Sequence, residues 1–341
     1  MTRHSLLITL FLVAIVMVMP NAHSQSEADV RRNLDSISSD TLYSYLFNLA
    51  RNEPAEARNQ ALIVLNEKVE TTPDSITADL LKIVGLSYYF EDNWRSAITF
   101  LDSSLYYYNR YNDTSGITSS YYNLGNIYSR LRLLDTALVL YEKGLNLAID
   151  AKDQKLFSLS LLGIGNTYSD LGKNEEAEDF YFKFLNASKD HENENNIALA
   201  YFNLGLNFQR KTMNFKALEY LFQSLELYEN IENPIGVIEV LNGIGSIFTE
   251  NQEYLKAHKY FERALEVCKH IGDNVREAET LGNIGAAFLE NDQVDSALVK
   301  FQQTLKKLEG LQYLFGMAPA YYRIGETYQK KGDFEAVSYT H

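Results

Sequence analysis

The chain has 341 residues, of which 46% are hydrophobic, 13% aromatic and 22% charged, and this balance excludes a disordered, collagen-like or low-complexity chain. Five prolines and 18 glycines are too few for an all-β protein built on many tight turns, and one cysteine excludes a disulfide scaffold or a cysteine-cluster metal site. The net charge of −14 argues against a nucleic-acid backbone as the main partner.

Residues 1–24 are predicted to be a secretory signal peptide. A basic start at Arg3 precedes an apolar run over residues 6–19, and residues 22–24 (Ala-His-Ser) supply a small-x-small cleavage site. The apolar run is shorter than the about 20 residues that cross a bilayer core. We therefore expect an exported protein, periplasmic or extracellular; the alternative is an uncleaved N-terminal anchor.

Residues 25–74 are expected to form a degenerate repeat that caps the repeats following it. Tyr45 stands 40 residues before Gly85, where those repeats would have a glycine. Ala57 and Leu65 nevertheless keep the spacing of the later repeats. A terminal repeat of this kind is typical of repeat proteins.

From residue 75 to residue 336 one period of 40 residues organises the chain. Glycine recurs at that interval, at Gly85, Gly125, Gly165, Gly205, Gly245, Gly285 and Gly325. Alanine lies 12 positions after the glycine, at Ala97, Ala137, Ala177, Ala217, Ala257 and Ala297. A large apolar or aromatic residue lies 16 positions after it, at Leu101, Tyr141, Tyr181, Leu221, Phe261 and Phe301.

These spacings predict two amphipathic helices in each repeat, helix A around the glycine and helix B around the alanine, because positions one helical turn apart share a face. A glycine inside a helix costs about 1 kcal/mol relative to alanine, so its recurrence indicates that a neighbouring helix approaches closely. We expect the alanine 12 positions later to be the small partner of the glycine. A larger side chain at either point should overpack the contact, at a cost of about 1–3 kcal/mol.

Polar residues and glycines between the expected helices predict the helix ends. A cap for the next helix A stands 28 positions after the glycine, at Asp113, Asp153, Asn193, Asn233 and Asp273. Asn174 and Asn214 are expected to be N-caps of helix B. Gly172 and Gly332 are expected to take the left-handed conformation that ends helix A.

One helix pair cannot bury its own apolar stripe, but stacked pairs can, so the predicted fold class is all-α, a right-handed α-solenoid of stacked antiparallel helix pairs. The run Leu-Gly-Asn-Ile-Tyr at 124–128, with Ala137, Tyr141 and Leu145, resembles a tetratricopeptide repeat (TPR), and the same markers cover residues 75–336. The 40-residue period is similar to the extended repeats of spindle-orientation adaptors, kinesin light chains and bacterial peptide-sensing regulators. With the secretion signal, the chain most resembles the extracytoplasmic sensory segment of bacterial signalling proteins.

The resemblance implies a concave groove lined by helix A, with side chains at positions −6, −3, +1, +4 and +5 from the glycine. In the first half these positions include Lys82, Tyr89, Phe90, Tyr122, Asn126, Arg130, Asn166, Phe202, Gln209 and Arg210. In the second half they include Asn242, a further candidate for ligand binding, and Glu239, Glu250, Glu279 and Glu290. We expect these acidic residues to be a solubilising face rather than a cation site.

The expected ligand of the groove is a peptide or protein segment. The amides of Asn126 and Asn166 can each donate to and accept from a peptide backbone, and Arg130 and Arg210 suit a carboxylate. Alanine at Asn126 and Asn166 is expected to weaken binding without lowering the melting temperature. The alternative is a groove that is merely solvated.

We expect no catalytic residue, no metal site and no cofactor, because the sequence has neither a His-Glu-x-x-His motif nor a nucleophile elbow nor a phosphate-cradling loop. His258 has no ligating residue four positions later and is expected to be a surface histidine. Cys268 falls on the apolar side of its helix and is expected to serve packing. Trp94, in a turn between helices A and B, is assigned no ligand role.

Residues 337–341 are a suspect tail. The alanine of the last repeat, Ala336, comes one residue early, and the closing Ser-Tyr-Thr-His resembles sequencing-adapter read-through. We therefore expect a fragment of a longer gene product, in which a membrane helix and an output domain (a kinase, cyclase or regulator) follow.

Taken together, these features predict a non-catalytic recognition module, the sensory N-terminal part of a bacterial membrane signalling protein. A free periplasmic or secreted scaffold that assembles envelope proteins is the alternative. An enzyme is disfavoured, since no constellation of catalytic residues is found.

Overall fold

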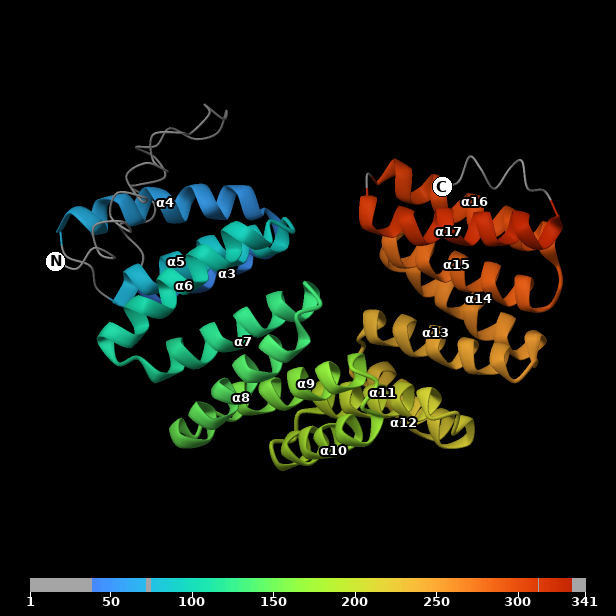
Figure 1. Cartoon of the computed structure of the whole chain (residues 1–341), viewed down its shortest axis with the longest axis horizontal. Coiled ribbons are helices and arrows are strands. Elements are labelled where there is room, and N and C mark those ends of the chain that lie inside the picture. The colour runs from blue at the N-terminus through green and yellow to red at the C-terminus, as the bar shows by residue number, and fades with distance from the viewer. Residues whose placement is uncertain (1–38, 72–74, 312, 333–341) are drawn as a thin grey trace. The chain divides into compact units, whose positions relative to one another are not determined.

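The computed structural model describes residues 39–71, 75–311 and 313–332 (Figure 1). In these ranges the chain forms fifteen helices, labelled α3 to α17, and no strand, which confirms the predicted all-α class. The predicted signal peptide and the tail at 337–341 lie outside the described residues. A span of the length and apolarity that a membrane requires is not found among the described helices.

The chain divides after Lys173 into two compact units, and each is described by itself. Unit 1 contains α3 (Ser39–Asn52), α4 (Pro54–Thr71), α5 (Ser75–Phe90), α6 (Trp94–Tyr111), α7 (Thr114–Arg130), α8 (Leu134–Ala151) and α9 (Gln154–Asp170). Unit 2 contains α10 (Asn174–Asp190), α11 (Glu194–Arg210), α12 (Asn214–Asn230), α13 (Pro234–Glu250), α14 (Tyr254–Ile271), α15 (Asn274–Glu290), α16 (Val294–Gly310) and α17 (Leu314–Lys331).

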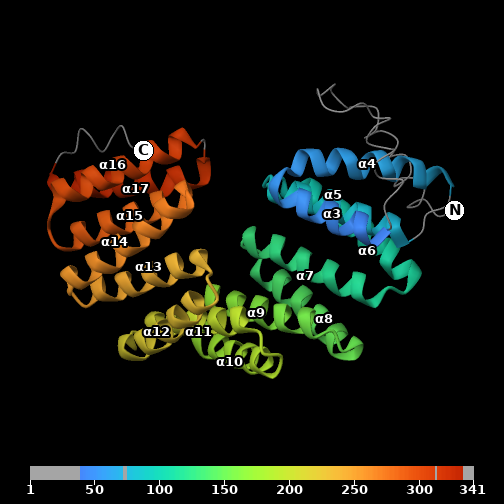
Figure 2. The same cartoon turned by 180° about the vertical axis from the view of Figure 1, so that it is seen from behind.

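The helices follow the predicted alternation. The periodic glycines lie in α5, α7, α9, α11, α13, α15 and α17, which are the A helices, and the periodic alanines lie in the B helices between them. Within each unit every helix packs against the next one along the chain, and each helix A packs against helix A of the following repeat, so that the pairs stack as Figures 1 and 2 show.

A further helix pair, α3 and α4, occupies the region expected to hold the degenerate first repeat, and both helices pack against α5. Ala57 and Leu65, the two residues that keep the repeat spacing, are both buried, and Leu65 belongs to the same core cluster of unit 1 as Leu46. Tyr45, which replaces the periodic glycine, is 43% exposed. Tyr45, which is too large for the position of the periodic glycine, therefore lies outside the core.

The periodic glycines make room for a partner other than the one predicted. A Cβ added to Gly125 would lie 2.7 Å from the ring of Tyr141, and one added to Gly245 would lie 2.5 Å from the ring of Phe261. Gly85, Gly205 and Gly285 are related in the same way to Leu101, Leu221 and Phe301. The prediction that the alanine 12 positions later is the partner is therefore wrong: the close contact is with the large side chain 16 positions later.

The alanines have their own place in the packing. All six periodic alanines are completely buried, and each lies on helix B within the first turn or two. An alanine backbone atom is also close to Gly205, where an added Cβ would meet the Ala217 carbonyl oxygen at 3.2 Å. The alanines on helix B thus allow helices A and B of a repeat to pack closely, while the glycine on helix A leaves room for a large side chain of helix B.

The predicted caps of helix A are confirmed. In each of five turns the side chain of Asp113, Asp153, Asn193, Asn233 or Asp273 accepts a hydrogen bond from the backbone N–H three residues later. The prediction for Asn214 is wrong, because this residue lies inside α12 and the N-cap is Met213. Its amide donates to Oδ1 of Asn251 instead, at 2.8 Å. Asn174 is likewise the first residue of α10.

Left-handed residues end the helices, as predicted for Gly172 and Gly332, whose φ angles are +73° and +79°. Among the residues that the structure describes, the same conformation occurs in nine that are not glycine, of which Thr212, at φ +57°, is the one β-branched example. The turns therefore impose this backbone geometry whether or not a glycine is present.

Candidate functional site

The residues predicted to line a groove fall on the A helices of both units. Tyr89, Tyr122, Asn126, Arg130 and Asn166 lie on α5, α7 and α9 of unit 1. Phe202, Gln209, Arg210 and Asn242 lie on α11 and α13 of unit 2. We call the surface formed by these helices the helix-A face of each unit, and describe the two faces separately.

In unit 1 the helix-A face carries a cation held against two aromatic rings. Nε of Arg130 donates to the hydroxyl oxygen of Tyr89 at 3.1 Å, and the guanidinium carbon lies 5.5 Å from the Tyr89 ring and 5.9 Å from the Trp94 ring. The two rings meet edge to face, with centroids 5.6 Å apart. Arg130 is exposed, and no carboxylate pairs with it among the described residues.

Trp94 is the residue that the sequence reasoning left out of this group. It begins helix B of the first full repeat, nine positions after Gly85, and its ring lies beside both Tyr89 and Arg130. The sequence feature that could have identified Trp94 is its position at the turn between α5 and α6, next to the end of helix A. An aromatic residue there extends the apolar wall around the guanidinium.

One turn earlier on α7, Asn126 and Tyr122 form a second polar group with Tyr141 of α8. The Tyr141 hydroxyl donates to Oδ1 of Asn126 at 2.6 Å, and the two tyrosine rings lie 5.9 Å apart. Burial raises the pKa of Tyr122 above its usual value, and a hydrogen bond with Asn126 opposes that rise. Asn126 is therefore committed to neighbouring side chains through its amide oxygen, although it remains partly exposed.

The equivalent positions in the neighbouring repeats differ from each other. Asn166 is exposed on α9 and already interacts with other groups. Lys82, on α5, is 7% exposed: its Nζ lies 3.5 Å from Oδ1 of Asp79 and 4.7 Å from the centroid of the Tyr43 ring. The structure thus encloses Lys82, contrary to its expected place in an open groove.

In unit 2 most of the predicted face is tied into polar pairs. Nε2 of Gln209 donates to Oε1 of Glu250 at 2.7 Å, and Nδ2 of Asn242 donates to Oγ1 of Thr280 at 3.0 Å. Both pairs link consecutive A helices. Phe202 is partly buried, and Arg210 is exposed and interacts with other groups.

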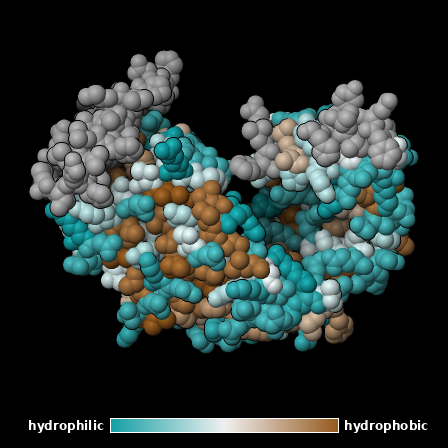
Figure 3. All heavy atoms as spheres, viewed as in Figure 1, coloured by the Kyte–Doolittle hydropathy of each residue, from teal (hydrophilic) through white to brown (hydrophobic). Residues whose placement is uncertain are grey.

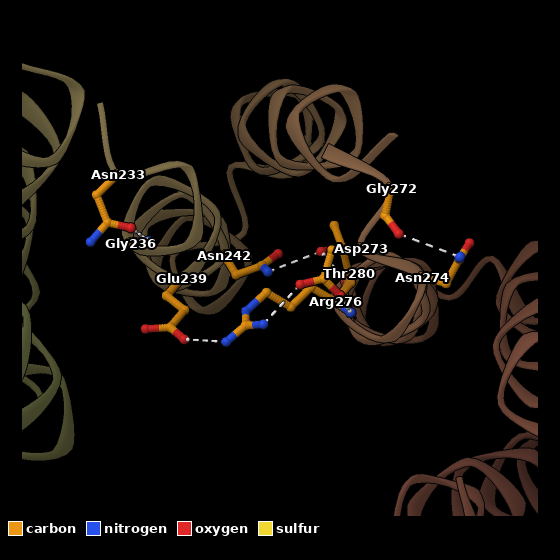
Figure 4. Close-up of polar contacts among 9 residues, drawn as sticks. All are labelled: Asn233, Gly236, Glu239, Asn242, Gly272, Asp273, Asn274, Arg276 and Thr280. Atoms are coloured by element: carbon orange, nitrogen blue, oxygen red, sulfur yellow. Dashed lines mark hydrogen bonds and ion pairs between the residues drawn. The ribbon is translucent and has the colours of Figure 1, made fainter. Parts of the chain in front are cut away.

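Arg276 bridges α13 and α15, as Figure 4 shows beside the Asn242–Thr280 pair. Its guanidinium lies 3.2 Å from Oε1 of Glu239 and 2.8 Å from Oδ2 of Asp273. Burial disfavours the charged form of Asp273, but hydrogen bonds from Arg276 outweigh it and lower the pKa of the carboxyl group. The acidic half is therefore not uniformly a solvated face, because Glu239 is held by a specific cation.

Glu279, one turn after Arg276 on α15, is the exception. No hydrogen bond or ion pair joins it to the described residues. The residue is exposed as a whole, yet partial burial of its carboxyl group raises the pKa of Glu279, with Asp273 and Glu239 adding to the rise and Arg276 opposing it.

Among the described residues no group of three or more histidine, cysteine, aspartate or glutamate side chains is placed to hold a metal ion. Cys268 is buried, as predicted, and burial raises the pKa of its thiol. His258 is a surface histidine, also as predicted, 3.7 Å from Oε1 of Glu262.

Hydrophobic side chains also reach the surface of unit 1. Figure 3 shows them gathered over the part of the unit that Figure 1 labels α7 and α8. Exposed aliphatic residues of this region include Leu133, Val139 and Ile149, each about half exposed. The turn and outer surface of this helix pair therefore offer apolar area in addition to the polar groups on its helix-A face.

Comparison with known protein families finds the tetratricopeptide repeat. Models of this repeat match residues 118–148, 160–194, 236–309 and 318–336, in both units. No curated protein matches the sequence.

Solved structures with the same arrangement of helices are numerous but distant in sequence. The apo form of the quorum sensor NprR from B. thuringiensis is 13% identical, with a TM-score of 0.69 over 92% of this chain and 89% of that one. Aspartyl phosphate phosphatase F from Bacillus subtilis is 13% identical, with a TM-score of 0.64 over 94% of each chain. The Rap conjugation gene regulator of the plasmid pLS20, in complex with the Phr* peptide, is 16% identical, with a TM-score of 0.61 over 90% of this chain and 92% of that one. These likenesses show a shared fold.

Proposed function

Because the chain belongs to the tetratricopeptide repeat family, we propose that it is a non-catalytic module that binds a peptide or protein segment through its helix-A faces. The observation that carries the proposal is the guanidinium of Arg130, which lies against Tyr89 and Trp94 without a carboxylate partner among the described residues. An exposed guanidinium that forms no ion pair with the described residues can form one with a carboxylate of a ligand.

The surrounding groups suit a peptide rather than a small anion. The rings of Tyr89 and Trp94 supply apolar area next to the guanidinium, and such rings contribute strongly to recognition because they are large and rigid. Asn126 and Tyr122 lie on α7, the helix of Arg130, one and two turns before it. An extended chain laid along this face would find an anion site, an apolar wall and backbone hydrogen-bond partners in succession.

Selection from a peptide library tests the proposal. The purified chain is used to enrich peptides that carry a carboxylate, and the best sequence is titrated into the wild type, Arg130→Gln and Arg110→Gln. Arg110 is a suitable control because it is an exposed arginine on α6, a helix B. We expect Arg130→Gln to weaken binding at least tenfold and Arg110→Gln to leave it unchanged. Equal affinities in all three proteins, or no enrichment, would contradict the proposal.

We further propose that binding serves sensing in an exported protein. Two structural neighbours, a quorum sensor and a conjugation regulator in complex with a peptide, support sensing, and the leader-like residues 1–24 support export. A fusion of residues 1–24 to a reporter that is active only outside the cytosol tests export. A kinase, cyclase or regulator domain encoded downstream in the same reading frame would support a sensor, while a capping helix followed by a stop codon would favour the free scaffold.

A further inference from the structure

Unit 2 contains a cavity of about 370 Å³ between α15, α16 and α17. Its volume lies near the lower end of the range of small-molecule sites, about 300–1,000 Å³, so it has room for one large side chain rather than for a folded segment. It opens on the helix-A face, since α15 contributes Glu279, Gly282 and Ala286, at positions −6, −3 and +1 from the periodic glycine.

The cavity exists because this repeat has small residues where the others have large ones. Position −3 is Gly282 here, whereas the other six repeats have Lys82, Tyr122, Leu162, Phe202, Asn242 and Tyr322. A Cβ added at Gly282 would meet only the Thr304 side chain, at 3.8 Å, an ordinary contact. On the opposite wall α17 contributes Gly316 and Ala320. The glycine at 282 is therefore required neither by close packing nor by a positive φ angle.

The floor of the cavity is apolar. Phe301, Leu308 and Ala320 line it, and each of them is at least nine-tenths buried. The one hydroxyl among the floor residues, that of Thr304, is already within hydrogen-bond distance of the carbonyl oxygens of Ala278 and Lys300, at 3.2 and 3.1 Å. The floor therefore suits an aliphatic chain and offers no unsatisfied donor to an anion.

The rim of the cavity carries one carboxylate that forms no ion pair among the described residues. Arg323 lies at the rim but pairs with Glu326 at 2.9 Å. Arg276, the nearest cation on the same helix, is engaged by Glu239 and Asp273. Glu279 is left without a hydrogen bond or an ion pair among the described residues.

We infer that this cavity binds a lysine or arginine side chain of the ligand, with the aliphatic stem on the floor and the cationic head against the Glu279 carboxylate. The inference rests on the proposed function, in that a peptide would deliver the side chain. Long basic side chains combine an apolar stem with a charged head, which matches the two halves of the cavity. An anion is disfavoured, because the uncompensated group at the rim is itself negative.

Single amino-acid derivatives test the cavity without a peptide. N-acetyl-arginine amide and N-acetyl-norleucine amide share an aliphatic stem and differ in the cationic head, and each is titrated into the purified chain with detection by NMR. We expect the arginine derivative to bind at least tenfold more tightly than the norleucine derivative. Equal affinities would overturn the cationic assignment and identify an apolar side-chain pocket instead, and no binding of either would overturn the site.

Two variants tie the binding to the cavity. Glu279→Gln keeps the size of the side chain and removes its charge. We expect it to weaken binding of the arginine derivative at least tenfold. Glu266→Gln, at an exposed position on α14 outside the cavity, makes the same change in net charge and should have no effect. An equal loss in both variants would mean that only the overall charge attracts the probe, and would overturn the inference.

Gly282→Leu fills the cavity and separates binding from folding. The added side chain enters open space and replaces a glycine within α15, so the thermal midpoint should not fall, while the arginine derivative should no longer bind. Retained binding in this variant would overturn the location of the site.

The proposed function and this inference fail separately. If the derivatives bind as described but the library yields no peptide, the module does not bind peptides and the cavity remains a site for a basic group. If peptides are enriched and depend on Arg130, yet carry no basic residue and the derivatives do not bind, the proposed function stands and the cavity inference is wrong.

Discussion

The hydroxyl of Tyr141 donates a hydrogen bond over 2.6 Å to Oδ1 of Asn126, from helix B to helix A of the same repeat. The ring of Tyr141 lies between two glycines, since a Cβ added at Gly125 or at Gly163 would approach it to 2.7 or 2.6 Å. One aromatic side chain of α8 thus packs against both α7 and α9 and orients a residue of the helix-A face. Stability and the candidate site are linked through this ring.

Asn126→Ala is therefore predicted to lower stability, contrary to the expectation from sequence. Tyr141 is only 3% exposed, so its hydroxyl would be left buried without an acceptor, which costs about 1–3 kcal/mol. Chemical denaturation of Asn126→Ala, Tyr141→Phe and the double variant measures the coupling. We expect the double variant to be less destabilised than the sum of the single variants, and strict additivity would show that the hydrogen bond contributes nothing.

Gly125→Ala is predicted to destabilise the protein, whereas Gly282→Ala is predicted to stabilise it. At Gly125 the new methyl group meets a ring that Gly163 confines from the other side, and overpacking of this kind costs about 1–3 kcal/mol. At Gly282 the methyl group meets nothing closer than 3.8 Å, so the higher helix propensity of alanine adds about 1 kcal/mol.

Thermal unfolding of the two glycine variants distinguishes packing from propensity, because the chemical change and the helical context are matched. Midpoints that move in opposite directions would support the close contact at Gly125. A rise in both would show that Tyr141 can move aside, and would contradict its role as a packed wedge between two helices.

Thr212→Gly is predicted to stabilise the protein by about 1 kcal/mol. A β-branched residue is strained at φ +57°, and glycine takes this conformation without a steric penalty. The matched change is Gly172→Ala at the equivalent turn in the preceding repeat, where φ is +73° and a Cβ would meet nothing within 4 Å. Any loss of stability in Gly172→Ala is due to the backbone conformation alone. We expect this variant to be less stable by about 1 kcal/mol, as measured by urea unfolding. Unchanged stability in both variants would contradict strain in these turns.

The helix-A caps and the alternation of helices were predictable because each depends on a local spacing. An aspartate or asparagine 28 positions after the glycine caps the first turn of α7, α9, α11, α13 and α15, whereas Tyr313 stands at this position before α17. The residue that contacts the glycine was not predictable from spacing, because the residues 12 and 16 positions after it share one face of helix B. Only the structure shows that the larger of the two side chains reaches the glycine.

The candidate site was predictable in its positions and not in its contacts. Placing Asn126, Arg130 and Asn242 on helix A follows from the period, but whether an amide faces a ligand or a neighbour depends on one residue of the next helix, such as Tyr141 or Thr280. The cavity beside Glu279 depends on the coincidence of small residues in two consecutive repeats, Gly282 and Ala286 with Gly316 and Ala320. A motif that compares one repeat with a consensus does not detect this.

The cap of α15 gives a prediction for pH. Burial disfavours the charge of Asp273, yet its hydrogen bonds with Arg276 lower the pKa of the carboxyl group below its ordinary value. Because the pKa is lower in the folded state than in the unfolded state, ionisation of Asp273 stabilises the fold above about pH 4, and this contribution is lost as the pH falls through the folded-state pKa. Asn193 and Asn233 show that asparagine caps the same turn, so Asp273→Asn removes the titration and keeps the cap.

We expect wild type to be more stable than Asp273→Asn at pH 7, where the carboxylate also pairs with Arg276, and the difference to shrink towards zero below pH 4. Guanidinium denaturation is unsuitable because it screens the ion pair, so urea unfolding at a series of pH values is the appropriate measurement. The Arg276 guanidinium also bridges to Glu239 on α13, and Glu239→Gln is therefore the control that removes the other carboxylate while leaving the cap in place. A difference between wild type and Asp273→Asn that does not change with pH would mean that asparagine and aspartate differ as caps by geometry alone, and that the charge of Asp273 does not stabilise the start of α15.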